Sequence, residues 1–246
     1  MRNIEVCLTP ELIHLYELEN KIVIVVDIFR ATSTMVTALA NGVQSITPVE
    51  NLETCRQMAS EDYVIAGERN GKTAEGFVLG NSPLSYLDEA YLHKKVAMTT
   101  TNGTLAIEKS KNGSAEILVG AFLNLHATAE YLKEKEHDII IHCAGWKGKY
   151  NLEDSLYAGA LIEALSETHT YDCDGALANR ALYLANKEDI NGFLAQASHA
   201  KRLQNHNIEA DIDFCLAVDK YELVARVDGG VLVKYERGRT RYEEQS

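Results

Sequence analysis

Short apolar runs alternate with stretches of helical spacing through the first part of the chain. The runs are rich in β-branched residues, as buried strands are. We expect strands at Ile22 to Ile28, Tyr63 to Ala66, Val96 to Thr99, Ile117 to Val119 and Asp138 to His142. We expect helices at Ser33 to Ala40, Leu52 to Ser60, Leu105 to Lys111 and Asn124 to Glu134. This alternation is typical of βαβ units, so the sequence predicts a three-layer α/β/α fold with a largely parallel or mixed sheet.

The pattern changes after Glu153, where the chain becomes mostly helical. Two β-rich runs near the end flank Asp228-Gly229-Gly230, which predicts a β-hairpin. Two earlier predicted helices end at Asn-Gly pairs 71 positions apart, Asn41-Gly42 and Asn112-Gly113, although any βα unit can end in this way. The chain is long enough for one large domain or for two similar small lobes, and we interpret it as two closely packed lobes, residues 1–123 and 124–246.

Composition narrows the class of protein. The 246 residues are 46% hydrophobic, enough for a substantial core, and 24 basic against 36 acidic residues give a net charge of −12. This charge argues against nucleic acid or an anionic membrane as a partner. Five widely spaced cysteines without a CxxC pair suggest neither a disulfide framework nor a zinc cluster. The N-terminus lacks the apolar region of a signal peptide, so we expect a cytoplasmic protein.

Polar residues follow several of the apolar runs directly. The clearest cases are IVIVVDIFRATST, KVAMTTTNGT and IIIHCAGWKG. Ligands of open α/β sheets bind at the carboxyl ends of the strands, where helix N-termini offer backbone N–H groups to anions. The sequence therefore predicts an enzyme for a small anionic substrate, with the polar segments gathered at one edge of the sheet.

The first polar segment contains Asp27 and Arg30. Asp27 is a candidate ligand of a divalent ion or a general base, and the alternative is an Asp that simply starts a turn. Arg30 offers a planar fork of donors suited to phosphate. The hydroxyls of Thr32, Ser33 and Thr34 can cap the following helix and donate to an oxyanion.

The segment after the second predicted strand adds Glu68 and Arg69 beside glycines. Glu68 is a second candidate metal ligand, and the alternative is a salt bridge with Arg69 or Lys72. Asn81-Ser82 precedes Pro83, where a plain polar turn is the alternative to a binding role.

TTTNGT, directly before a predicted helix, is a compact set of anion donors. Its alternative is a turn with a threonine N-cap. The candidate residues of this segment are Thr100, Thr101, Asn102, Gly103 and Thr104.

Cys143 ends another predicted strand, where a thiolate nucleophile would be well placed, although a buried inert cysteine is the commoner case. The loop of protein tyrosine phosphatases requires an arginine at the position that Lys149 occupies relative to Cys143, so we reject that mechanism. The haloacid dehalogenase type needs a second Asp where this chain has Phe29.

Glu153 and Asp154 open the alanine-rich helix that follows CAGWKG. Acidic residues in a first turn favour the helix dipole, which is the simple explanation. Together with Asp27 and Glu68, the pair would instead complete a magnesium site.

The motifs taken together resemble those of the 2-phosphosulfolactate phosphatase family. The resemblance runs from about Ile22 to Val227 in unchanged order, through VVDIFRATST, GERNG, GFVLGNSPL, TTTNGT, CAGWKG, LEDSLYAGAL, ASHAKRL and DIDFCLAVDKYELV. It implies a magnesium-dependent acid phosphatase that converts 2-phospho-3-sulfolactate to 3-sulfolactate, a step toward coenzyme M, on a three-layer α/β fold with two related lobes. This chain departs from the pattern at Ala200, after His199, where the family pattern has glycine.

The resemblance singles out the candidate residues already named, and it adds Gly145. We expect Asp27, Glu68, Glu153 and Asp154 to hold or orient Mg²⁺, and we assign catalytic roles to Asp27, Arg30, Cys143 and Glu153. The expected substrate-binding residues are Arg30, Thr32, Ser33, Thr34, Arg69, Asn81, Ser82, Thr100, Thr101, Asn102, Gly103, Thr104 and Gly145.

Four alternatives stay open at this point. Cys143 could act as a nucleophile, but attack by water needs fewer assumptions. The substrate could be another small phosphorylated hydroxy acid, or the protein could bind a phosphometabolite without catalysis. A homodimer is also left open.

Overall fold

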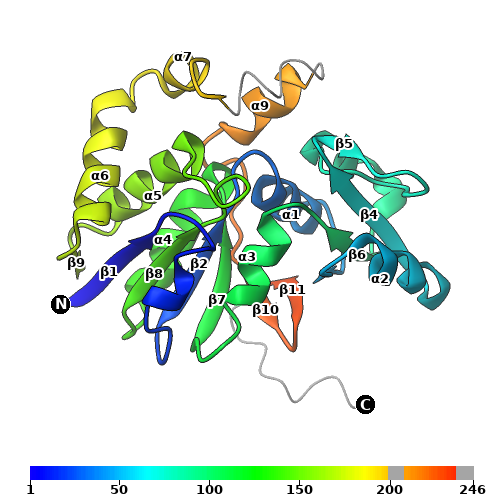
Figure 1. Cartoon of the computed structure of the whole chain (residues 1–246), viewed down its shortest axis with the longest axis horizontal. Helices are drawn as coiled ribbons and strands as arrows, with labels where there is room; N and C mark the ends of the chain where they lie inside the picture. The colour runs from blue at the N-terminus through cyan, green and yellow to red at the C-terminus, as the bar shows by residue number, and fades with distance from the viewer. Residues whose placement is uncertain (199–207, 237–246) are drawn as a thin grey trace.

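The computed structural model of the chain describes residues 1–198 and 208–236, which form one mixed eleven-stranded sheet with helices packed against it (Figure 1). The spatial order of the strands is β5-β4-β6-β3-β11-β10-β7-β2-β8-β1-β9. The strands are β1 (Arg2–Cys7), β2 (Ile22–Val26), β3 (Ser45–Pro48), β4 (Tyr63–Arg69), β5 (Lys72–Thr73), β6 (Lys95–Thr99), β7 (Glu116–Gly120), β8 (Ile139–Cys143), β9 (His169–Thr170), β10 (Ala225–Asp228) and β11 (Val231–Lys234).

The described helices follow the predicted alternation. They are α1 (Ala31–Ala40), α2 (Leu52–Gln57), α3 (Gly103–Lys109), α4 (Leu125–Lys133), α5 (Leu152–Ala164), α6 (Asp174–Asn186), α7 (Ile190–Leu194) and α9 (Glu209–Cys215). The three-layer α/β/α prediction is confirmed, as are the five predicted strands and the C-terminal hairpin of β10 and β11. The patterns missed β1, β3, β5 and β9: β3, β5 and β9 have only two to four residues, and β1 carries charged residues at half-buried positions.

The sheet consists of two blocks of parallel strands. In one block β1 pairs with β8 and β9, and β2 pairs with β7 and β8. In the other block β6 pairs with β3 and β4. The hairpin lies between the blocks, with β10 antiparallel to β7 and β11 antiparallel to β3, so the two blocks run in opposite directions.

This topology corrects the expectation that all polar segments share one edge of a parallel sheet. The segments after β2 and β8 belong to one block, whereas those after β4 and β6 belong to the other. Twist accumulates from strand to strand across a sheet, so strand ends of the two blocks can still face one another. The proposed division at residue 123 stays a prediction. Strand pairing crosses it, because both β1 and β2 pair with β8.

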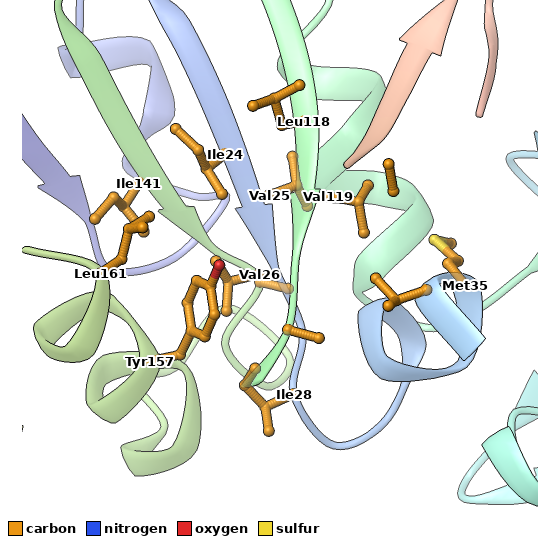
Figure 2. Close-up of a cluster of buried hydrophobic side chains, with 14 of the residues drawn as sticks. Ile24, Val25, Val26, Ile28, Met35, Leu118, Val119, Ile141, Tyr157 and Leu161 are labelled. Atoms are coloured by element: carbon orange, nitrogen blue, oxygen red, sulfur yellow. The ribbon is translucent and has the colours of Figure 1, made fainter. Parts of the chain in front are cut away.

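The core holds β2 rigidly, and the candidate site starts at the end of that strand. Every residue of β2 is at most 1% exposed. Figure 2 shows Tyr157 and Leu161 of α5 on the left of β2 and Met35 of α1 on its right. Tyr157 also packs edge-on against Phe122, with ring centroids 5.5 Å apart. Large buried side chains on both sides therefore fix the point at which the chain leaves β2.

The described part of the chain contains no helix that is both long and apolar enough to cross a membrane. All five cysteines are free thiols. The cytoplasmic location and the homodimer stay predictions.

Candidate active site

Asp27 follows β2 and is 4% exposed. Its backbone closes the turn into α1: the Asp27 N–H donates to Thr32 Oγ1 (3.0 Å), and the Thr32 N–H donates to the Asp27 carbonyl (3.0 Å). Asp27 thus does start a turn, as the simple interpretation held. That turn uses only its backbone, so the carboxylate is left to other partners.

The start of α3 lies against this carboxylate. A Cβ atom added at Gly103 would lie 2.9 Å from Asp27 Oδ2 and 2.6 Å from the Cβ of Ala31. Only a glycine allows this approach, which brings the TTTNGT segment of one block to the end of β2 in the other. The two segments are therefore adjacent, as predicted, although they follow strands of two blocks that run in opposite directions.

Replacing Gly103 by alanine should lower activity by roughly 10- to 100-fold, because the methyl group displaces the Asp27 carboxylate or the start of α3. Helix propensity alone would favour alanine by about 1 kcal/mol, so a loss of activity shows that the close approach outweighs propensity. The matched control is Gly175→Ala in α6, where an added Cβ meets nothing nearer than 3.4 Å. Rates of phosphate release and melting temperatures of both variants test this, and equal activity in the two would contradict it.

Asp154 lies in the first turn of α5 and is completely buried. The Ile28 N–H donates to its Oδ1 (2.9 Å), and the Gly145 N–H donates to its Oδ2 (3.0 Å). Burial, followed by the negative charges of Asp27 and Glu153, raises the pKa of Asp154 well above its usual value. Asp154 therefore joins the loops after β2 and β8 within a cluster of three neighbouring carboxyl groups.

The loop after β8 depends on Gly145, which has a φ of +55°. An added Cβ would lie 2.4 Å from the Lys149 carbonyl oxygen, so the loop can close only on glycine. On the far side of this loop the Lys147 N–H donates to Asn102 Oδ1 (3.2 Å). The CAGWKG and TTTNGT segments are thus in direct contact.

Cys143 ends β8 and is 1% exposed. Burial, aided by the charge of Asp154, raises the pKa of its thiol well above the usual value. The neutral thiol is a poor nucleophile. Catalysis by Cys143 stays an untested prediction, and this environment favours the alternative of attack by water.

Glu68 is the penultimate residue of β4 and joins two loops of the second block. Its Oε1 accepts the Gly71 N–H (2.6 Å), and its Oε2 accepts the Thr101 hydroxyl (3.1 Å) and the Thr101 N–H (3.3 Å). Glu68 forms no ion pair with Arg69 or Lys72 in the described structure, so the salt-bridge alternative is wrong. The Arg69 guanidinium instead donates to the Glu68 carbonyl (2.6 Å) and to Thr99 Oγ1 (3.3 Å).

Several predicted oxyanion donors already have protein partners. The Ser33 hydroxyl donates to the Ile28 carbonyl (2.9 Å), and the Thr34 hydroxyl donates to the Asn81 carbonyl (3.2 Å). The Thr104 hydroxyl donates to the Thr100 carbonyl (3.0 Å), whereas Thr100 Oγ1 accepts the Thr104 N–H (3.1 Å). These hydroxyls stabilise the loops at the site, and their contact with substrate stays a prediction.

Arg30 is a buried cation of the site, with 4% of its surface exposed. It forms a buried salt bridge with Asp211 of α9 and donates to the Gly71 carbonyl (3.0 Å). The Ser82 hydroxyl donates to the other oxygen of Asp211 (2.6 Å). These residues line a cavity of about 290 Å³ together with Thr73, Asn81, Leu84, Ile208 and Ala210.

Asp211 is the functional candidate that the sequence interpretation missed. It lies 181 positions from Arg30, and the signal was its position in the DIDF segment quoted for the family resemblance. Ser198 lies within the described residues, whereas His199 and Ala200 of the same motif lie outside them.

The predicted Mg²⁺ site can be compared with the donors present. Within residues 1–198 and 208–236 no three Asp, Glu, His or Cys side chains form a group that could hold a metal by itself. Mg²⁺ in phosphate chemistry, however, often uses only one or two carboxylates, with water and substrate phosphate as the other ligands. Asp27 and Glu153 each raise the pKa of Asp154, which places both of them near that carboxyl group. These carboxylates are of the kind that holds a magnesium ion together with water and substrate, and the bound Mg²⁺ stays a prediction.

The fold and this geometry define a class: an α/β enzyme with buried carboxylates and a buried arginine beside a cavity, suited to a small anionic substrate. Residues 7–230 match the family profile described as 2-phosphosulpholactate phosphatase. A Thermotoga maritima protein named "Probable 2-phosphosulfolactate phosphatase" is 42% identical over 218 residues, which cover 89% of this chain and 94% of the relative. Proteins of the same name from Caldanaerobacter subterraneus subsp. tengcongensis and Clostridium botulinum are 36% and 34% identical, over 88% of this chain and 91% and 92% of their own lengths.

The chain belongs to the 2-phosphosulpholactate phosphatase family. It is thus a phosphoric monoester hydrolase. The family resemblance stated from the motifs is confirmed.

Proposed function

We propose that the protein hydrolyses 2-phospho-3-sulfolactate to 3-sulfolactate and inorganic phosphate with the help of Mg²⁺. The observation that carries this proposal is the buried Arg30 at the wall of a cavity, three residues after the buried Asp27. The names of the relatives supply the substrate. A phosphorylated sulfonate carries negative charge at both ends, in keeping with a site built around an arginine.

The reaction breaks the bond between phosphorus and the ester oxygen. A water oxygen forms the new bond to phosphorus, and the proton that water loses balances the proton gained by the leaving hydroxyl group of 3-sulfolactate. We assign the role of general base to Asp27, whose carboxylate lies against the start of α3, and the role of joining the loops after β2 and β8 to Asp154. Arg30 stabilises the charge on the phosphoryl oxygens.

A bound Mg²⁺ would neutralise phosphoryl charge and lower the pKa of water. Asp27 and Glu153 would hold it, with Asp154 and Glu68 orienting the loops that carry the ligands. The same cluster argues against a non-catalytic anion receptor, because neighbouring carboxylates would repel a bound phosphate in the absence of a cation.

The test is phosphate release from phosphosulfolactate, phospholactate and phosphoglycerate, each with Mg²⁺ and with EDTA. We expect the highest kcat/KM for phosphosulfolactate, loss of activity in EDTA and recovery when Mg²⁺ is added in excess. Undiminished turnover in EDTA would exclude the metal role. A preference for another ester would change the substrate, and binding without release from any ester would leave only a phosphometabolite receptor.

A further inference from the structure

The Arg30 guanidinium uses only part of its hydrogen-bonding capacity. A guanidinium has five N–H donors. In the described structure Arg30 donates one to Asp211 and one to the Gly71 carbonyl, which leaves three for a ligand. Arg30 lines the cavity of about 290 Å³, which places this residue beside any ligand bound there.

Asn81 supplies an independent indication of a ligand at the same place. It is 8% exposed and lines the cavity, and its side-chain Oδ1 has no hydrogen-bond partner among the described residues. A buried amide oxygen without a partner is destabilising, so a ligand that bonds the amide would recover stability. The oxygen and nitrogen of an amide can exchange places by rotation, which allows Asn81 to donate to an oxyanion as well.

The position of Arg30 depends on residues distant in the sequence. Asp211 is 4% exposed and holds one end of the guanidinium, and Ser82 in turn donates to Asp211 (2.6 Å). A buried ion pair is weak evidence for stability, because desolvation of both charges offsets their attraction. What the pair does supply here is a fixed orientation of the guanidinium fork.

We propose that Arg30 and Asn81 form an oxyanion subsite in this cavity and that Asp211 is its positioning residue, so that the exact placement of the guanidinium depends on α9. The ligand is a group with three terminal oxygens, which is the shared chemistry of the phosphoryl and sulfonate ends of the substrate. This inference rests on the proposed function for the substrate, but the existence of the subsite can be tested without turnover.

The main variant is Asp211→Asn, with Asp213→Asn as the matched control because Asp213 is an exposed residue of the same helix. We expect Asp211→Asn to raise KM for phosphosulfolactate by about tenfold or more with a smaller change in kcat, because a misplaced guanidinium binds the anion poorly. Asp213→Asn should have the KM of the wild type. Phospholactate, which lacks the sulfonate, shows which end of the substrate the subsite binds. If the subsite binds the phosphoryl group, Asp211→Asn raises KM for both esters. If the subsite binds the sulfonate, Asp211→Asn raises KM for phosphosulfolactate alone.

Ser82→Ala tests the same inference should Asp211→Asn not fold, because it removes one hydrogen bond to Asp211 and leaves every charge in place. We expect KM for phosphosulfolactate to rise by roughly two- to fivefold, because one hydrogen bond to the charged Asp211 carboxylate is lost. An unchanged KM in Ser82→Ala, or in a folded Asp211→Asn, would overturn the inference.

Calorimetric titration with inorganic phosphate and with methanesulfonate separates this inference from the proposed function. Binding of either ion to the wild type that weakens about tenfold in Asp211→Asn supports the subsite, even if no ester is hydrolysed. Normal hydrolysis together with identical anion binding in wild type and Asp211→Asn would overturn the subsite and leave the proposed function intact.

Discussion

Asp27→Asn is expected to lower kcat for phosphate release by roughly 10²- to 10⁴-fold, the range typical for loss of a general base. The amide keeps the size of the side chain, so the close approach of Gly103 should survive. What is lost is the negative charge that accepts a proton from water and helps to hold Mg²⁺. Asp213→Asn on the surface of α9 provides the control for loss of one acidic residue.

The same substitution should not destabilise the fold. Asp27 helps to raise the pKa of Asp154 in the folded protein. When a carboxyl group has a raised pKa in the folded state, the folding stability of the protein falls as pH rises through that pKa. Removing the Asp27 charge weakens this effect, so the melting temperature in EDTA at neutral pH should equal or exceed that of the wild type. A kcat within about tenfold of the wild type would contradict the catalytic role, and a clearly lower melting temperature would contradict the electrostatic argument.

Arg30→Gln is expected to impair both stability and activity. It leaves Asp211 buried without its cation, and breaking a buried ion pair from one side typically costs roughly 3–5 kcal/mol. It also removes the guanidinium that stabilises phosphoryl charge, which should lower kcat/KM by roughly 10²- to 10³-fold. Urea denaturation and steady-state kinetics measure the two effects separately.

The double variant Arg30→Gln with Asp211→Asn separates the effect of Arg30 on stability from its effect on activity. Two neutral amides leave no unpaired buried charge, so most of the lost stability should return, whereas activity should not. If the double variant regains activity together with stability, Arg30 acts only through the fold. If the single variant is as stable as the wild type, the salt bridge does not contribute in the way its burial indicates.

The hydrophobic pattern was sufficient to predict the strands that lie next to the site. The runs that became β2, β6 and β8 are apolar over nearly their whole length, and burial on both faces explains this. The polar residues after them were found for the same reason, since Asp27 and Cys143 lie where an apolar run ends. Short strands such as β3 were not predicted, because four residues are too few to establish a hydrophobic period.

Partnerships between distant residues could not be predicted in the same way. Glu68 was predicted as a metal ligand, with a salt bridge to Arg69 or Lys72 as the alternative. It accepts N–H and O–H groups of Gly71 and Thr101 instead of that salt bridge, because the loops after β4 and β6 lie side by side. The three hydroxyls at the start of α1 gave a strong signal for an anion site, yet Ser33 and Thr34 donate to backbone carbonyls. Hydroxyl-rich segments stabilise loops and bind anions with the same chemistry, so composition alone cannot distinguish the two.

The sequence by itself determined the alternating elements, the acidic and basic residues at strand ends and, through the order of its motifs, the family. Apolar periodicity and local turn chemistry are properties of neighbouring residues, and they can be read without knowing the fold. Only the tertiary structure decided that the two blocks run in opposite directions, that Gly103 lies against Asp27 and that Asp211 pairs with Arg30. These contacts join residues far apart in the chain, and their geometry depends on how the whole sheet brings its loops together.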